Sequence, residues 1–151
     1  ELAVEACCDK FFIVRTSWLF SARGQNFVKT ILKLADEKDE ISVVKDQIGS
    51  PTYAPDLAVS LCEIIHSEEY GFYHATNEGT CTFYEFAEEV VKQSGKQLVI
   101  KPISSDAYGA RAPRPHNSVM AKDSLDRSGF HRLPDWKDAL SRCLKELQIE
   151  S

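Results

Sequence analysis

The sequence lacks the features of nucleic-acid-binding and membrane proteins. Its 18 Lys and Arg are outnumbered by 23 Asp and Glu, giving a formal net charge of −5, whereas nucleic-acid-binding modules are usually basic. Its longest apolar runs fall far short of the ~18 residues that a membrane-spanning helix needs. Residues 1–5 have neither the basic region nor the apolar stretch of a signal peptide. We therefore expect a cytoplasmic protein that binds neither nucleic acid nor membrane.

Motifs for metals, phosphates and nucleophilic catalysis are also missing. The five cysteines have no C-x-x-C spacing and the four histidines have no metal-ligand spacing, so we predict no metal site. We expect the cysteines to be free thiols, buried or half-buried, in a reducing compartment. No G-x-G-x-x-G, G-x-x-x-x-G-K or G-x-S-x-G motif occurs. Judged from these motifs alone, the sequence predicts a ligand-binding protein fragment without a recognisable group of catalytic residues.

Short apolar runs alternate with amphipathic helical patterns, which is typical of an α/β fold. The chain has 151 residues, which is the length of one domain and is enough to form a hydrophobic core. We expect strands at residues 11–14, 41–44, 71–76, 97–100 and 117–120. We expect helices at residues 2–8, from 27 to 35, after 55, after 82, at 121–128 and after 135, with an irregular stretch at 102–115. Because the strands are few and short and no initiator Met is present, we expect a fragment whose sheet continues upstream of Glu1.

Local signals mark several helix ends. Thr82 and Glu85 form a capping box, and Gly95 can close the helix that they start. Pro55 can occupy the first position of its helix, and Asp135 can cap the terminal helix. We expect the core-facing residues of the Pro55 helix to be Leu57, Leu61, Ile64 and Ile65.

The residues that follow the first expected strand are the first candidates for a ligand-binding site. The apolar run Phe11 to Val14 is typical of a strand buried on both faces in a parallel sheet. Arg15, Thr16 and Ser17 follow it directly, and Trp18 comes next. Ligands in open α/β sheets lie beyond the carboxyl ends of strands, so this polar tail is expected near a ligand.

Five blocks of sequence occur in an order that carries a family resemblance. They are Val14-Arg15-Thr16-Ser17-Trp18, Gln25 to Thr30, Asp46-Gln47-Ile48-Gly49-Ser50-Pro51-Thr52, Tyr73-His74-Ala75-Thr76 and Ala112 to Ser118, with Pro134-Asp135-Trp136 before the last helix. The series resembles the C-terminal half of dTDP-4-dehydrorhamnose reductases, which are extended short-chain dehydrogenase/reductases. The resemblance covers almost the whole chain. It implies the C-terminal part of a Rossmann-type reductase, with residues 1–20 as the tail of the cofactor domain and 21–151 mostly a substrate-binding domain with a C-terminal helix.

The family reduces the C4 ketone of dTDP-4-dehydro-L-rhamnose to give dTDP-L-rhamnose, with NADPH or NADH as hydride donor. Its glycine-rich cofactor turn and its Tyr-x-x-x-Lys catalytic pair match no part of this sequence. The resemblance therefore implies that the cofactor is bound mainly by a missing N-terminal part. It implies no catalytic residue in this chain and no activity of the chain alone.

The resemblance also implies roles for individual residues. Trp18 matches a residue that packs against the sugar, since an indole offers a flat apolar face; a core tryptophan is the alternative. Arg15, Thr16 and Ser17 would lie near the nicotinamide, or would only shape their turn. Asn26 would line the nucleotide-sugar cleft, or would only cap a helix.

Arginines of the proline-rich stretch are candidates for the diphosphate. Arg114 could donate two parallel hydrogen bonds to phosphate oxygens, with Arg111 as the weaker candidate; an ion pair that pins the loop is the alternative for Arg114. Gln47, Gly49 and Pro51 are expected to build the loop beside the cleft. Some family members hold Mg²⁺ at a dimer interface, but Pro55 replaces one expected carboxylate while Glu146 falls near another, so that metal site is doubtful here.

Two rival functions stay open. The chain could belong to another nucleotide-sugar reductase or epimerase of the superfamily, or to a non-catalytic regulatory subunit on the same fold. The expected partner is a small-molecule nucleotide sugar, with a homodimer as a further option. We also expect the strand at residues 11–16 to present an open edge that promotes self-association.

Overall fold

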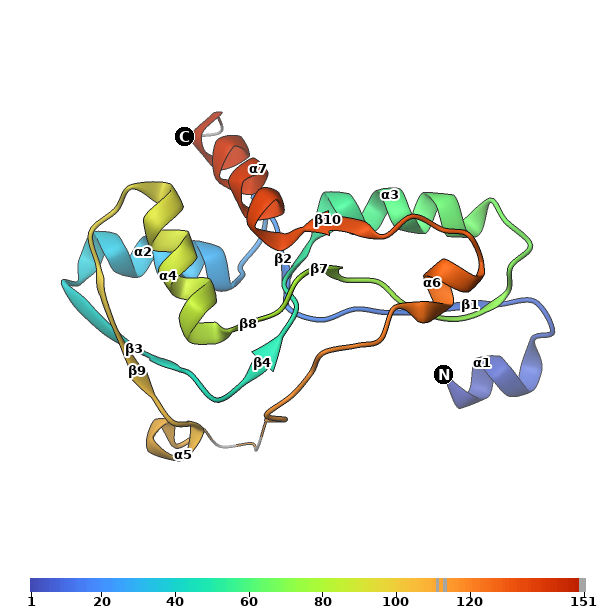
Figure 1. Cartoon of the computed structure of the whole chain (residues 1–151), viewed down its shortest axis with the longest axis horizontal. Helices are drawn as coiled ribbons and strands as arrows, with labels where there is room; N and C mark the ends of the chain where they lie inside the picture. Colours follow the sequence, from blue (N-terminus) through green and yellow to red (C-terminus); the bar gives the residue numbers. More distant parts are fainter. Residues whose placement is uncertain (111, 113, 150–151) are drawn as a thin grey trace.

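The first strand forms one side of a small lobe. The computed structural model describes residues 1–110, 112 and 114–149. Strand β1 (Phe12–Arg15) pairs in parallel with β6 (Gly71–His74), and Phe12 lies opposite Gly71. Helices α3 (Ala54–Ile65) and α6 (Asp123–Arg127) pack here, and Ile64, Tyr73 and Leu125 form a buried cluster. We call this group the α3 lobe (Figure 1).

A larger core joins three helices and a second parallel pair. Helices α2 (Phe27–Glu37), α4 (Phe83–Ser94) and α7 (Trp136–Ile149) surround it. Strands β3 (Glu40–Val44) and β9 (Val99–Ile103) pair in parallel beside α4. The ring of Phe86 contacts those of Phe20, Phe27 and Trp136 at centroid distances of 5.3–5.6 Å. We call this group the α4 lobe (Figure 1).

Short strand pairs lie between the two lobes (Figure 1). Strand β2 (Leu19–Phe20) pairs in parallel with β5 (Thr52–Tyr53), and β7 (Asn77–Glu78) with β10 (Leu133–Asp135). Strand β4 (Ile48–Gly49) pairs antiparallel with β8 (Cys81–Thr82). Two short helices complete the described elements, α1 (Leu2–Cys7) and α5 (Ser105–Tyr108). The α/β class is thus confirmed.

Helix ends follow the local signals. The hydroxyl of Thr82 accepts from the Glu85 amide and the Glu85 carboxylate accepts from the Thr82 amide, so the capping box is formed. Gly95 ends α4 with a φ of 69°, a left-handed conformation that suits glycine. The Asp135 carboxylate accepts from the Lys137 amide at the start of α7. These predictions are confirmed because each depends on residues within four positions of one another.

Several expectations are wrong. Residues 117–120 form no strand, only a bridge between Asn117 and Ile48, because the Asn117 side chain accepts from the Val119 amide and turns the backbone. Strand β9 begins and ends later than expected, and α5 lies within the stretch expected to be irregular. Ile65 is 58% exposed, since it is one position from the buried Ile64 on the same helix. Cys7, Cys8 and Cys62 are exposed; only Cys81 and Cys143 among the five cysteines are buried.

Strand β1 is less covered than expected. Residues 12–14 are half-buried and Arg15 is exposed. Its only strand partner among the described residues is β6, so its second edge is open in this part of the chain. The division of the chain at residue 20 stays a prediction, and the structure adds that β1 depends on β6, which lies far beyond that boundary.

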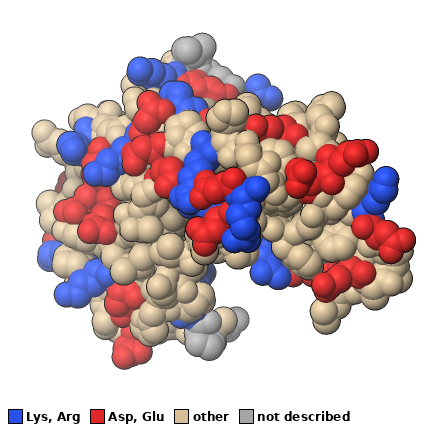
Figure 2. Space-filling model, turned by 45° about the vertical axis from the view of Figure 1, so that its right-hand side comes forward, with Lys and Arg blue, Asp and Glu red and all other residues tan. Residues whose placement is uncertain are grey.

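The surface and the helices show two further features. In the view of Figure 2, acidic and basic side chains interleave over the middle of the face and do not separate into patches of one sign. Across the described residues, no helix combines the length and apolar character required to cross a bilayer.

Candidate functional site

The turn after β1 is held by hydrogen bonds to the β5 strand. The hydroxyl of Thr52 donates to the Ser17 carbonyl (2.7 Å) and the Thr52 amide donates to the Trp18 carbonyl (3.1 Å). The Ser17 hydroxyl donates in turn to the Ser50 carbonyl (3.2 Å). Trp18 has a φ of 47°, which is uncommon for a bulky residue and costs energy unless the surroundings impose it. The turn therefore holds Trp18 in a strained conformation.

The indole of Trp18 lies between the core and solvent. It is half-buried and stacks on the ring of Phe83, with centroids 3.7 Å apart and planes inclined by 15°. Gly49 lies against the atoms Cε2 and Cζ2 of the indole. Phe83 comes near because the antiparallel pairing of β4 with β8 places the start of α4 beside Gly49. Trp18 therefore both packs on the core cluster and presents part of its ring to solvent.

A hollow of about 250 Å³ lies next to this stack. Phe83 belongs to both the stack and the lining, and Phe27, which also lines the hollow, contacts the Phe83 ring at 5.2 Å. Trp18 itself is not among the lining residues. Arg114 and Tyr108 line the hollow from the segment after β9. The remaining lining residues are Thr30, Ile31, Leu34, Ile41, Ser42, Val43, Val44, Gln47 and Ala110. Among the described residues the lining has a guanidinium and no carboxylate, which suits an anionic ligand with an apolar part.

Hydrogen bonds hold the chain in place both before and after Arg114. Before it, the Asp46 carboxylate accepts from the Ser105 amide (2.9 and 3.0 Å) and hydroxyl (2.7 Å). These bonds, led by the one from the Ser105 amide, hold the pKa of Asp46 below its usual value. After it, the Ile48 amide donates to the His116 carbonyl (2.8 Å). Arg114 itself is exposed and makes no ion pair or hydrogen bond with the residues that the structure describes, so other groups pin the loop.

The loop of β4 is held by packing and hydrogen bonds, and its Gln47 also lines the hollow. Gln47 is 6% exposed and donates to the Ser105 hydroxyl (2.8 Å). Pro51 is fully buried, and Gly49 is covered by the Trp18 indole. These residues place the turn of Trp18 and the segment of Arg114 on either side of one strand.

The other predicted residues have local partners. Arg15 forms an ion pair with Glu1 (2.5 Å), and its carbonyl accepts from the Ala75 amide (2.9 Å). Thr16 is exposed at the carboxyl end of β1. Asn26 caps α2: its oxygen accepts from the Lys29 amide (3.2 Å), and its Nδ2 donates to the Ser21 carbonyl (2.7 Å). Asn26 is not among the lining residues of the hollow, and Arg111 lies outside the described residues.

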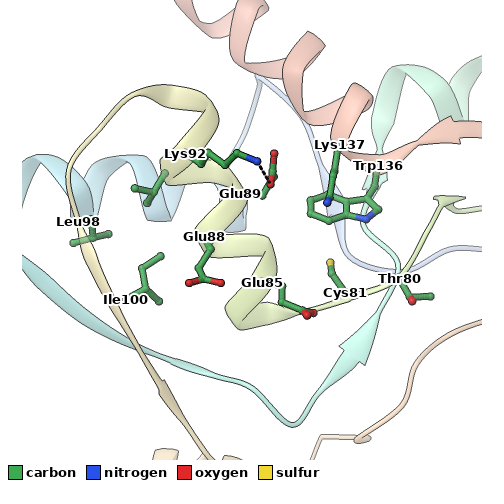
Figure 3. Close-up of a pocket in the computed structure, with 11 residues that line it drawn as sticks. Thr80, Cys81, Glu85, Glu88, Glu89, Lys92, Leu98, Ile100, Trp136 and Lys137 are labelled. Atoms are coloured by element: carbon green, nitrogen blue, oxygen red, sulfur yellow. Dashed lines mark hydrogen bonds and ion pairs between the residues drawn. The ribbon is translucent and has the colours of Figure 1, made fainter.

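A second hollow, of about 610 Å³, lies between α4, β9 and the start of α7. Figure 3 shows three carboxylates along α4, those of Glu85, Glu88 and Glu89, with Trp136 and Lys137 beside them. Glu89 forms an ion pair with Lys92 (3.3 Å). Burial raises the pKa of Glu89, but bonds from Gln93 and Lys92 outweigh it and the pKa is lowered. With three carboxylates against two ammonium groups among the described residues, this hollow disfavours an anionic ligand. None of the predicted residues that the structure describes lines it.

No group of three or more potential metal ligands occurs among the described residues. The Glu146 carboxylate accepts from the Tyr53 hydroxyl (2.5 Å), and Pro55 is the second residue of α3, whose N-cap is Tyr53. Burial of the phenol, and then this hydrogen bond, raise the pKa of Tyr53. Glu146 is therefore engaged within the chain.

Sequence reasoning missed the two phenylalanines of the site. Phe27 and Phe83 lie in segments for which only helices were expected, yet they also line the hollow, and Phe83 stacks on Trp18. Their position at the first residue of α2 and of α4 was the available signal. A side chain there lies at the helix end, where it can reach both the core and a cleft.

A family model and several known proteins match most of this chain. Residues 1–149 match the family described as RmlD substrate binding domain. The chain is 42% identical over 134 residues to the spore coat polysaccharide biosynthesis protein SpsK of Bacillus subtilis, covering 89% of this chain and 47% of that protein. It is 36% identical over 161 residues to the dTDP-4-dehydrorhamnose reductase of Sinorhizobium fredii, covering 99% and 54%.

A solved structure is similar in the same region. The crystal structure of dTDP-4-dehydrorhamnose reductase from Bacillus anthracis, in complex with NADP, superposes with a TM-score of 0.92 at 43% identity, covering 95% of this chain and 51% of that one. The chain thus spans about half the length of the relatives that it matches.

Proposed function

The chain belongs to the RmlD substrate binding domain family, and on this premise we propose that it is the substrate-binding portion of a dTDP-4-dehydrorhamnose reductase. The complete protein would reduce the C4 ketone of dTDP-4-dehydro-L-rhamnose to dTDP-L-rhamnose. In this chain the hollow beside Trp18 receives the nucleotide sugar. The other functions considered above, a different nucleotide-sugar enzyme or a regulatory subunit, are not favoured by any feature of the site.

One observation carries the proposal: within the part of the chain that the structure describes, the Arg114 guanidinium has no partner and lines an apolar hollow without a carboxylate. A nucleoside diphosphate sugar needs a cation for its phosphates and apolar surface for its base and sugar. Arg114 can donate two parallel hydrogen bonds to phosphate oxygens. The exposed part of the Trp18 indole offers a flat face to sugar C–H groups. The chain would therefore bind and orient the substrate.

We assign the hydride chemistry to a nicotinamide cofactor, NADPH or NADH, which would supply the hydride when bound. Arg15, Thr16 and Ser17 follow the carboxyl end of β1, the side on which α/β sheets bind ligands. Of these, Thr16 is exposed, while Arg15 and Ser17 are engaged with Glu1 and Ser50. Their role is to close one side of the cofactor site through the fixed turn.

The test is oxidation of NADPH by the complete protein that carries this chain, with dTDP-4-dehydro-L-rhamnose as substrate. We expect turnover and formation of dTDP-L-rhamnose, and no turnover by the 151-residue chain assayed in parallel. A complete protein that turns over a different nucleotide sugar and not this one would support the rival enzyme class. A complete protein with no turnover of any nucleotide sugar would support a binding subunit.

A further inference from the structure

We propose that Gly49 is a positioning residue, whose missing side chain fixes the orientation of the Trp18 indole toward the sugar. The proposal rests on the proposed function, since it takes Trp18 to contact the substrate. The β4 strand would then not only form part of a loop but also set the orientation of the Trp18 indole.

No side chain fits at Gly49. A Cβ built there would lie 2.7 Å from Cζ2 of Trp18 and 2.7 Å from the hydroxyl of Ser118, with Cε2 of the indole nearer still. Carbon atoms in contact are normally ~3.5–4.0 Å apart. The φ of Gly49 lies outside the left-handed region, so an alanine would have an ordinary backbone there. The obstacle is therefore the indole, not the conformation of the glycine.

The indole of Trp18 is held in place by contacts on its ring and on its backbone. Phe83 stacks on it with centroids 3.7 Å apart. The backbone of Trp18 is held at a φ of 47° by the two hydrogen bonds from Thr52. An added methyl group at residue 49 must consequently rotate the indole away from its stacked position or displace the whole turn.

Gly49 also faces the segment that carries Arg114. Ser118 donates to the Ile48 carbonyl through both its amide (2.9 Å) and its hydroxyl (3.1 Å). The indole and the Ser118 hydroxyl therefore both border the space that a Cβ of residue 49 would occupy. A side chain at residue 49 would push the two apart, changing the orientation of the sugar relative to the anchored diphosphate. Because a misplacement of about 1 Å can cost up to about a hundredfold in rate, we expect the effect mainly on kcat.

The experiment uses the complete protein labelled with 5-fluorotryptophan and the substitution Gly49→Ala. The ¹⁹F resonance of Trp18, assigned by its loss in Trp18→Phe, should shift, and kcat should fall about tenfold while KM changes less than about threefold. Phenylalanine lacks Cε2 and Cζ2 of the indole. In the Trp18→Phe background, Gly49→Ala should therefore change kcat by less than about twofold, the non-additivity expected of residues in contact.

Gly24→Ala is the matched control. Gly24 has a φ of +70° and nothing within 4 Å of a built Cβ, so this alanine strains the backbone without touching the site. It should leave the Trp18 resonance and kcat unchanged. If Gly49→Ala does not fold, Phe83→Leu replaces it. Removing the ring that supports the indole should also shift the resonance and lower kcat.

The outcomes separate this proposal from the proposed function. An unshifted Trp18 resonance in a folded variant overturns the proposal. So does an unchanged kcat, or a fall in kcat that is equally large in the Trp18→Phe background. Wild-type protein that fails to reduce dTDP-4-dehydro-L-rhamnose contradicts the proposed function instead.

Discussion

At the scale of the residue, Trp18 packs on Phe83, and we propose that it also binds the substrate. A fully buried Trp→Ala change costs about 3–5 kcal/mol, and Trp136, which is 3% exposed, should show that full cost. Trp18 is half-buried, so Trp18→Ala should cost about 2 kcal/mol. It should also lower kcat/KM at least tenfold, equivalent to about 1.4 kcal/mol of lost transition-state contact. Thermal unfolding and steady-state kinetics of the two variants check this. A large fall in stability with unchanged kinetics would make Trp18 a core residue only.

Arg114 should act on binding and not on stability. Its side chain is exposed and has no partner among the described residues. Arg114→Ala should raise KM for the nucleotide sugar about tenfold to a hundredfold, the range for lost hydrogen bonds to a charged group. Arg114→Lys should lie between, because an ammonium keeps the charge but loses the planar pair of donors. Arg127→Ala, an exposed arginine of α6, is the control. Equal KM values for all of these variants would remove Arg114 from the site.

At the scale of elements, an ion pair joins α3 to α7. Arg142 donates to both oxygens of Asp56 (2.6 and 2.7 Å), and Asn77 donates to Asp56 as well (2.7 Å). The side chain of Asp56 is 10% exposed. Burial raises its pKa, but the hydrogen bonds from Arg142 and Asn77 outweigh this and the pKa is lowered from 3.8. The carboxylate therefore contributes stability above about pH 4, and this contribution is lost as the pH falls through the lowered pKa.

Asp56→Asn should destabilise the fold by about 2 kcal/mol at pH 7, since it replaces an ionised acceptor of two donors. The variant should also lose less stability than wild type on going from pH 5 to pH 3. Asp138→Asn is the matched control, because exposed Asp138 binds the same arginine through Nε (2.9 Å), and exposed pairs contribute little. Urea unfolding at the two pH values measures both effects. Equal destabilisation by the two substitutions would contradict this account.

The open edge of β1 should promote association. Its second edge has no strand partner among the described residues, and the neighbouring helix α1 has no buried residue. An apolar edge invites pairing with another chain. We expect the 151-residue chain to self-associate in sedimentation equilibrium, and Ile13→Lys on β1 to reduce this. Ile65→Lys, at an exposed position of α3, should not. A chain that stays monomeric at high concentration would refute the prediction.

At the scale of the whole molecule, the parts predicted from sequence are those with local causes. The capping box of Thr82 and Glu85 and the left-handed Gly95 involve residues within a turn or at its end. The family blocks pointed to the correct family. The contacts that build the site are long-range: Trp18 meets Phe83 and Gly49 only after β4 pairs with β8. No periodicity in the sequence specifies such pairing, so the strain at Trp18 and the second role of Phe83 could not be predicted.

At the scale of the whole molecule, the central question is which of the two hollows binds the nucleotide sugar. Among the described residues, one is lined by Arg114 without a carboxylate, and the other by three carboxylates of α4. The deciding measurement is a crystal structure of the complete protein with dTDP-L-rhamnose bound. The account predicts the diphosphate within hydrogen-bond distance of Arg114 and the hexose against the indole of Trp18. A nucleotide sugar bound in the hollow of Figure 3, or one that contacts neither residue, would contradict it.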